Sequence, residues 1–196
     1  MTTFVGDLKA AHLEARLASY TRLRGGFPIP MAGTLYWLAV AALSQFFEPS
    51  EQLFYSFVAS GMIFPVALLF AAIFRNNFMK DKGAATSVLL PAFISMLLFW
   101  PIVIVAVTEN SANTALIILA IGLSLHWPVI GWSYGRTALF SAHSVIRAIL
   151  VLALYFAFPE QRFLFIPLAV AFVYAMTVIA LLIDSRNVLS TKMEPS

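Results

Sequence analysis

The sequence contains no cysteine and few charged side chains. Its 196 residues include 12 Lys and Arg and 9 Asp and Glu, so charged residues make up only 11% of the chain. The absence of cysteine excludes disulfides, a thiol nucleophile and a cysteine-ligated metal or iron–sulfur cluster. Soluble globular domains contain about 25% charged residues, and the low charge content therefore argues against an ordinary soluble protein.

The chain is instead rich in apolar residues. They make up 61% of the chain, whereas soluble domains contain about 45–50%. This composition excludes intrinsic disorder, because disordered chains are poor in apolar residues. The formal net charge of +3 does not indicate a nucleic-acid partner, since the basic residues lie between long apolar runs, where membrane topology accounts for them.

Six stretches are long and apolar enough to cross a bilayer, which takes about 20 residues in a helix. They show no period-two alternation, and unpaired backbone groups are costly in lipid, so each stretch is expected to be helical. The predicted fold is all-α, a polytopic membrane protein with six transmembrane helices and a short N-terminal cytoplasmic helix. The six stretches are Phe27–Phe47, Leu53–Phe74, Thr86–Val107, Asn113–Gly131, Thr137–Phe158 and Phe163–Ile183.

The N-terminal helix is expected over residues 3–23, which are rich in helix formers and too often charged for a signal peptide. It either lies in the membrane interface or packs on the bundle, and Gly25 and Gly26 end it. We therefore predict three parts: residues 1–26, a cytoplasmic or interfacial helix; residues 27–183, the six-helix transmembrane bundle; and residues 184–196, a cytoplasmic tail.

The basic residues predict the orientation. With the N-terminus inside, the inner segments hold ten of the 12 Lys and Arg, the outer loops hold only Arg162, and Arg147 lies within a span. The positive-inside rule then places both termini in the cytoplasm. Membrane lipids are the expected surroundings, and small residues on helix faces leave a homo-oligomer open.

Polar and aromatic side chains gather between His126 and Arg147. Helical spacing puts Arg136, His143 and Arg147 on one face of the fifth predicted helix. Arg147 is then about 15 Å along the helix from its cytoplasmic end, near the bilayer centre, where a charge costs about 2.5–3.5 kcal/mol. No Asp or Glu lies well inside any span, so its partner is a carbonyl, a helix C-terminus, a bound anion, or a hydroxyl such as that of Ser144, Ser95 or Tyr174.

Two interpretations of Arg147 stay open. It either hydrogen-bonds kinked backbone near Pro101 or Pro128, or binds an anion in a cavity that opens to the cytoplasm, as a planar guanidinium can. In the second case His143 and His126 donate hydrogen bonds or relay protons, Arg136 guards the mouth, and Trp127 and Trp132 form apolar walls. The candidate ligand-binding residues are Arg147, His143, His126, Arg136, Trp127, Trp132 and Tyr134.

The sequence predicts no catalytic residue, metal or cofactor. The segment from Gly131 to Gly135 matches G-x-S-x-G, but that motif works only on a strand-to-helix turn with a base and an acid nearby. Two histidines without an acidic third ligand make a poor metal site. The leading function is binding or transport of a small anionic or amphiphilic ligand. A non-catalytic structural or accessory subunit is the alternative, and an intramembrane hydrolase that uses Ser133 or His126 is less favoured.

Two short segments, Leu98–Val103 and Leu125–Ile130, resemble each other through a shared Trp-Pro pair. They lie on adjacent spans rather than at matching places in two halves, so the similarity is interpreted as coincidence.

Several segments of the chain are distinctive: HWPVIGWSYGR and TALFSAHSVIR, with Gly26-Phe27-Pro28, Ala32-Gly33 and Tyr36-Trp37 upstream. Through these segments the chain resembles a family of small bacterial six-helix membrane proteins that is defined as a domain of unknown function. The resemblance extends from about Arg24 to Leu182. It implies six membrane helices in a bacterial cytoplasmic membrane, and it implies no activity.

Overall fold

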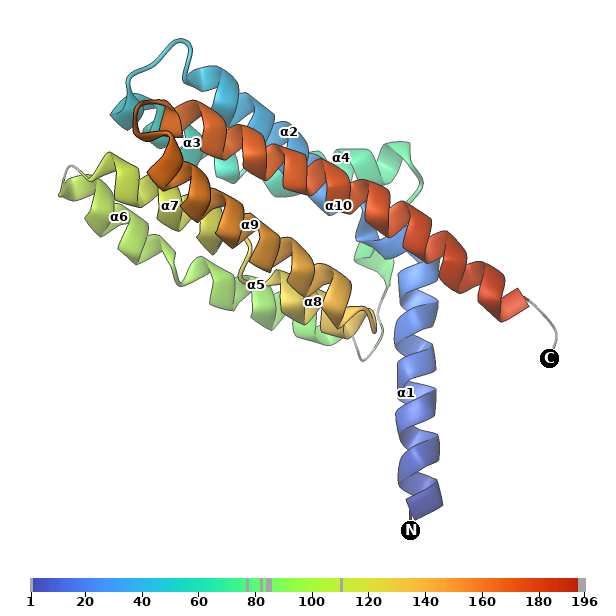
Figure 1. The fold of residues 1–196 in the computed structure, drawn as a ribbon. Coiled ribbons are helices and arrows are strands. Elements are labelled where there is room, and N and C mark those ends of the chain that lie inside the picture. Colours follow the sequence, from blue (N-terminus) through green and yellow to red (C-terminus); the bar gives the residue numbers. More distant parts are fainter. Residues whose placement is uncertain (1, 77, 82, 84–85, 110, 194–196) are drawn as a thin grey trace.

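The computed structural model describes residues 2–76, 78–81, 83, 86–109 and 111–193. Every regular element in these ranges is a helix (Figure 1). The α-helices are α1 (Thr2–Arg22), α2 (Pro28–Leu43), α3 (Pro49–Ser60), α4 (Ile63–Ile73), α5 (Leu89–Leu97), α6 (Trp100–Thr108), α7 (Ala112–Gly122), α8 (Trp127–Ser133), α9 (Thr137–Ala157) and α10 (Arg162–Met193). Short 3₁₀ turns cover Arg24–Gly26, Phe78–Lys80, Thr86–Val88 and Pro159–Gln161.

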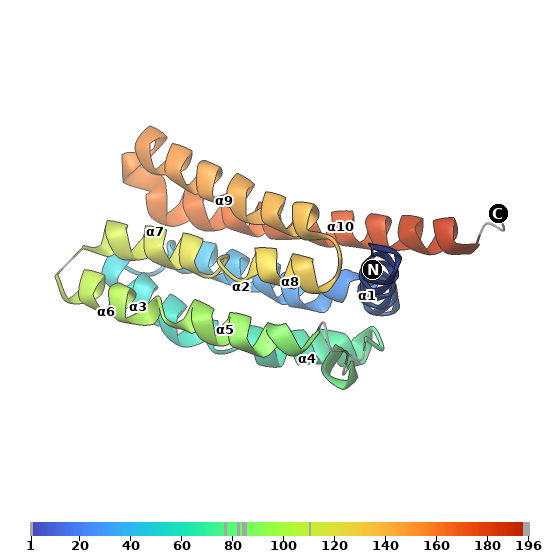
Figure 2. The ribbon, with the colours of Figure 1, turned by 90° about the horizontal axis from the view of Figure 1, so that it is seen from below.

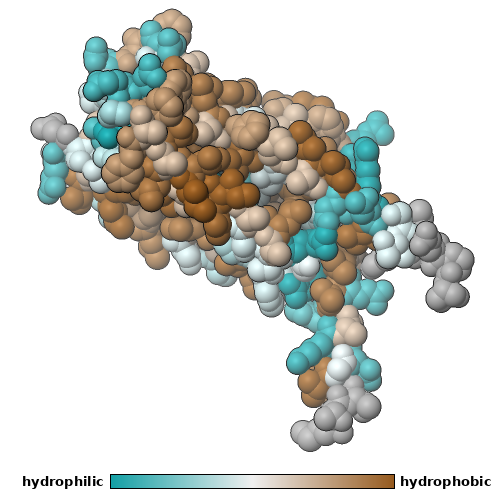
Figure 3. Space-filling model, in the orientation of Figure 1, coloured by the Kyte–Doolittle hydropathy of each residue, from teal (hydrophilic) through white to brown (hydrophobic). Residues whose placement is uncertain are grey.

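The helices are long and apolar enough for an integral membrane protein. Five helical stretches could cross a membrane by length and composition, and two of them, Pro91–Thr108 and Ala112–Ser133, join α5 to α6 and α7 to α8. The pair α3 and α4, bent by 49°, makes a sixth span when counted as one. An apolar surface covers the middle of the bundle, and polar residues gather toward its two ends (Figure 3). The predicted all-α fold with several membrane-spanning helices is thereby confirmed.

Helices α9 and α10 form one layer of the bundle, α2, α7 and α8 form the next, and α3 to α6 form the third (Figure 2). Helix α10 packs along both α2 and α9. The N-terminal helix α1 projects from the end of the bundle at which α10 also extends beyond its neighbours (Figure 1). Residues 184–193, part of the predicted tail, continue α10 as helix up to Met193.

The second, third and fourth spans are each interrupted, at the junctions of α3 with α4, α5 with α6 and α7 with α8. Trp100 begins α6 and Trp127 begins α8, each with proline as the next residue. Proline has no N–H to donate to the preceding turn, so it suits a helix start. The two Trp-Pro segments therefore have the same local structure, in which each begins a half-helix after an interruption.

The interruptions of the third and fourth spans contact each other. Gly122, at the end of α7, lies so close to Phe99 that a Cβ atom there would be 2.7 Å from the ring. A second close contact joins α2 to α10, where a Cβ on Gly33 would be 2.6 Å from the ring of Tyr174. Glycine at these two places lets neighbouring helices approach closely.

We predict that Gly33→Ala destabilises the bundle by about 1–3 kcal/mol, the usual cost of overpacking a core. The ring of Tyr174 is buried and cannot move away without disturbing its neighbours. Unfolding of the purified protein in detergent measures the effect. Gly6→Ala is the control, because a Cβ atom on Gly6 meets nothing within 4 Å; equal stabilities of the two variants would contradict the prediction.

Candidate functional site

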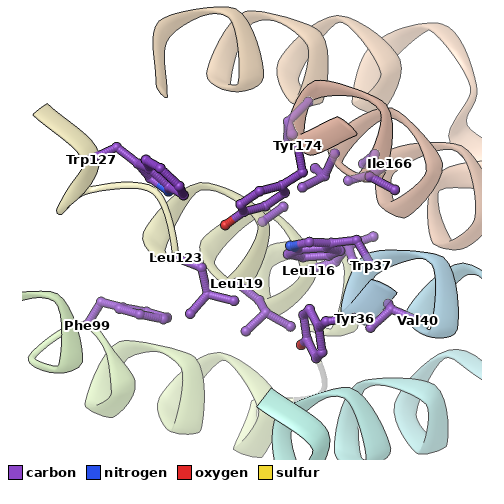
Figure 4. Packing of buried hydrophobic residues seen from close by; sticks show 14 of the residues in the cluster. Tyr36, Trp37, Val40, Phe99, Leu116, Leu119, Leu123, Trp127, Ile166 and Tyr174 are labelled. Carbon is purple, nitrogen blue, oxygen red and sulfur yellow. The ribbon is translucent and has the colours of Figure 1, made fainter. Parts of the chain in front are cut away.

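Arg147 lies in the middle of α9 and is completely buried, with 0% of its surface exposed. Two aromatic rings cover it: the central carbon of its guanidinium is 5.2 Å from the centre of the Trp37 ring and 5.1 Å from that of Tyr174. Because Trp37 belongs to α2 and Tyr174 to α10, three helices enclose the charge. Figure 4 shows the ring of Tyr174 between those of Trp37 and Trp127.

The guanidinium of Arg147 is incompletely hydrogen-bonded. Its Nη1 donates to the hydroxyl of Tyr174 at 3.0 Å, but Nε and Nη2 are buried without an acceptor among the described residues. These two nitrogens form one edge of the guanidinium, with N–H groups that point in the same direction. The two ion pairs found in the described part of the chain are Arg22–Asp81 and Arg136–Asp184, so neither supplies Arg147 with a carboxylate.

His143 lies one turn before Arg147 on α9 and is also buried. Its Nδ1 is 2.7 Å from the hydroxyl of Thr177, and that hydroxyl donates to the carbonyl of Val173 at 2.7 Å. A hydroxyl has one proton to donate, so Thr177 accepts from His143 and Nδ1 carries a hydrogen. The other ring nitrogen, Nε2, is buried without a partner among the described residues, and in neutral His143 it is an acceptor.

Three further buried polar atoms here also have no partner in the described part of the chain: the indole Nε1 of Trp37, the indole Nε1 of Trp127, and Nδ1 of His126. The Trp127 ring is 4.6 Å from that of His143 and 5.5 Å from that of His126, measured between ring centres. An indole nitrogen can only donate, so the region has more donors than acceptors. We call these residues the Arg147 cluster: Trp37, His126, Trp127, His143, Arg147 and Tyr174.

The other predicted site residues lie in a second group, where α1 meets the bundle. Arg136 donates to Asp184 on α10 through Nε at 2.7 Å and through Nη2, and the hydroxyl of Tyr20 on α1 donates to the same carboxylate at 2.6 Å. These hydrogen bonds raise the pKa of Arg136. Burial and the neighbouring Asp184 carboxylate raise the pKa of Tyr20, so its phenol keeps its proton.

Trp132 and Tyr134 also contact α1. The guanidinium of Arg16 lies 4.5 Å from the ring centre of Trp132 and donates to its carbonyl. Tyr134 is buried against Tyr20, with 5.9 Å between their ring centres, and burial raises the pKa of Tyr134. The structure therefore brings Arg147, His143, His126 and Trp127 together, and it places Arg136, Trp132 and Tyr134 at the junction with α1.

Within the described part of the chain, Arg147 has none of its surface exposed and is enclosed by rings, so it does not line an open cavity in this structure. One cavity, of about 400 Å³, lies between the end of α1 and the segment after α4, and another, of about 160 Å³, lies between α2 and the bent pair α3 and α4. Neither is lined by Arg147 or His143. Tyr174 is one of the hydroxyl partners that the sequence suggested for Arg147, whereas the ring of Trp37 was not predicted as part of the site.

The hydroxyl of Ser133 donates to the carbonyl of Ile130 in its own helix at 2.8 Å. No hydrogen bond joins it to His126 or His143 within the described residues. No group of three His, Asp or Glu residues among them is arranged to hold a metal ion.

A family model, that of a family of unknown function (DUF7010), matches residues 13–184. This match covers most of the chain, and the chain therefore belongs to that family, as the resemblance in its sequence indicated. No curated protein and no solved structure matches it significantly.

We predict that Asp184→Asn loosens α1 from the bundle, because the substitution removes the negative charge that Arg136 and Tyr20 share. Hydrogen exchange at the C-terminal turns of α1 should become about tenfold faster, which corresponds to about 1.4 kcal/mol of local stability. Asp7→Asn, on the exposed part of α1, is the control. Unchanged exchange in the Asp184 variant would show that the ion pair does not hold α1.

Proposed function

We propose that this protein binds a small anionic or amphiphilic molecule at the Arg147 cluster and carries or holds it within the membrane, as a transporter or a lipid-binding protein. The single observation that supports this is the edge of Arg147, formed by Nε and Nη2, which is buried without an acceptor among the described residues. A carboxylate or phosphate matches that edge, because two of its oxygens can accept two parallel N–H groups.

The composition of the cluster favours an anion over a cation or a neutral guest. A buried guanidinium loses its hydration, and this cost is compensated only by good partners. Tyr174 and the ring of Trp37 supply part of the compensation. The indole N–H groups of Trp37 and Trp127 add further donors, which an anion could also use.

In this structure the proposed site is closed, because Arg147 has none of its surface exposed, and a ligand would reach it after a rearrangement of the helices. Interrupted helices are common where transporters bind their substrates, since they allow local rearrangement. Trp127 of the cluster begins the short helix α8 directly after such an interruption. We propose that both termini lie in the cytoplasm, because ten of the 12 Lys and Arg fall on that side when the N-terminus is inside, and the resemblance noted in the sequence suggests a bacterial cytoplasmic membrane.

An accessory subunit is the second candidate, and the enclosure of Arg147 is the observation that favours it. In that case the guanidinium links α2, α9 and α10 and serves stability alone. The two candidates differ in what happens when the charge is removed.

We predict that Arg147→Met leaves the stability of the protein in detergent unchanged or increases it by about 1–4 kcal/mol, as replacing buried charge by a hydrophobic side chain can do. Sodium decanoate should raise the unfolding temperature of the wild-type protein and not that of the variant. Decanol has the same chain without the carboxylate and should raise neither.

Arg162→Met is the matched control, because Arg162 also lies over a tyrosine ring, 3.8 Å from the centre of Tyr155, at the opposite end of the bundle. It should keep the decanoate response. A strong loss of stability in Arg147→Met, together with no response of the wild type to decanoate, would favour the accessory subunit and reject a binding site.

A further inference from the structure

A second positively charged site lies at the end of the bundle near α1. The cavity of about 400 Å³ is lined by Arg22, Leu23, Arg75, Lys80 and Asp81. These residues come from two segments, the junction of α1 with α2 and the segment that follows α4. None of them belongs to the Arg147 cluster, so this cavity is a separate feature of the molecule.

Side-chain interactions hold the two segments together around the cavity. Arg24 donates to the carbonyl of Phe74 at 2.5 Å, and the buried Asn76 donates to the carbonyl of Leu23 at 2.6 Å. Arg22 forms an ion pair with Asp81. The walls of the cavity are therefore fixed from both sides by specific contacts.

The cavity carries more positive than negative charge. Arg22, Arg75 and Lys80 face one carboxylate, that of Asp81, and Asp81 is paired with Arg22. Arg75 and Lys80 form no ion pair with another described residue. Ile73 and Met79, close to these cations in the chain, are 61% and 59% exposed, and such apolar side chains suit the region where lipid tails begin.

The backbone near the cavity adopts a left-handed conformation at two arginines. Arg24 and Arg75 have φ angles of 48° and 52°, and they are the two non-glycine residues with positive φ in the described part of the chain. The left-handed conformation costs an ordinary residue about 1–2 kcal/mol, whereas glycine adopts it freely. Residues kept in such conformations cluster at functional sites. Because glycine would adopt this conformation at lower cost, arginine at both positions indicates that the arginine side chains are needed there.

We infer that this cavity binds a phosphate group, with Arg75 and Lys80 as its principal cationic partners. Two cations that form no ion pair with a described carboxylate, beside this cavity, match the charge and the oxygen acceptors of a phosphate. The headgroup of an anionic phospholipid brings this group to the membrane interface, where basic pockets at helix ends bind such headgroups. A soluble phosphate compound offers the same chemistry.

The test uses the full-length protein in nanodiscs of phosphatidylcholine with phosphatidylglycerol as a minor component. After release into detergent, native mass spectrometry counts the lipids that each protein retains. The wild type should retain phosphatidylglycerol in preference to phosphatidylcholine, and Arg75→Gln with Lys80→Gln should reduce this retention at least about tenfold. Exchanging the two cations, Arg75→Lys with Lys80→Arg, should restore most of it.

Lys9→Gln with Arg186→Gln is the matched control, because it removes the same charge from exposed positions outside the cavity. In a second arm, inorganic phosphate is titrated into the protein in nanodiscs of phosphatidylcholine alone. Binding of phosphate that requires Arg75 and Lys80, without retention of phosphatidylglycerol, would identify a soluble ligand as the source.

Equal retention in the Arg75 and Lys80 variant and the wild type, with no binding of phosphate, would overturn the inference. Equal loss in the control variant would overturn it too, because the effect would then be general attraction between charges. The response to decanoate at Arg147 should be the same in the Arg75 and Lys80 variant as in the wild type, so a failure of one site is distinguishable from a failure of the other.

Discussion

The burial of one guanidinium without a carboxylate constrains the middle of this bundle. Arg147 is on α9, and its charge is tolerable in the membrane only because Tyr174 of α10 accepts one hydrogen bond and two rings cover its faces. The ring of Tyr174 can take that position only because Gly33 of α2 has no Cβ atom to meet it. The close approach of α2 to α10 and the environment of the charge on α9 therefore depend on each other. A change at any of the three residues alters the other two.

A second arginine, at the end of the bundle near α1, has a different kind of partner. Arg136 receives a full partner there, because Asp184 accepts from two of its nitrogens and from the hydroxyl of Tyr20 as well. At this junction the arginine that links α9 to α10 therefore has a carboxylate partner. Arg147 differs from Arg136, because no described carboxylate pairs with it although its complete burial makes such a partner most valuable. This contrast, more than the burial itself, favours an anionic guest over a purely structural role.

Much of the fold could be predicted from the sequence because membrane spans are set by length and hydropathy, which are local properties. The site could be predicted only in part. Spacing correctly joined His143 to Arg147, since both lie within the regular helix α9. It failed for Arg136, which precedes that helix and follows a turn at Gly135 with a φ angle of 70°, so helical periodicity does not govern its direction. Trp37 was missed as part of the site because it lies on a uniformly apolar span, where no periodic pattern distinguishes the inner face. Asp184 was missed because it lies just beyond the predicted end of the last span.

The arrangement of continuous and interrupted helices indicates which side of the Arg147 cluster can move at the lowest cost. Helices α2, α9 and α10 each run without a break past Arg147, and the tight contact at Gly33 holds two of them together. The wall formed by Trp127 is different, because it begins a seven-residue helix after an interruption. The backbone there is held by short turns, in which Ser124 donates to Ile121 and Trp127 to Ser124. Such turns are weaker than the regular ladder of an α-helix. If the proposed ligand reaches Arg147, displacement of Trp127 therefore opens the site at lower cost than separation of α2 from α10.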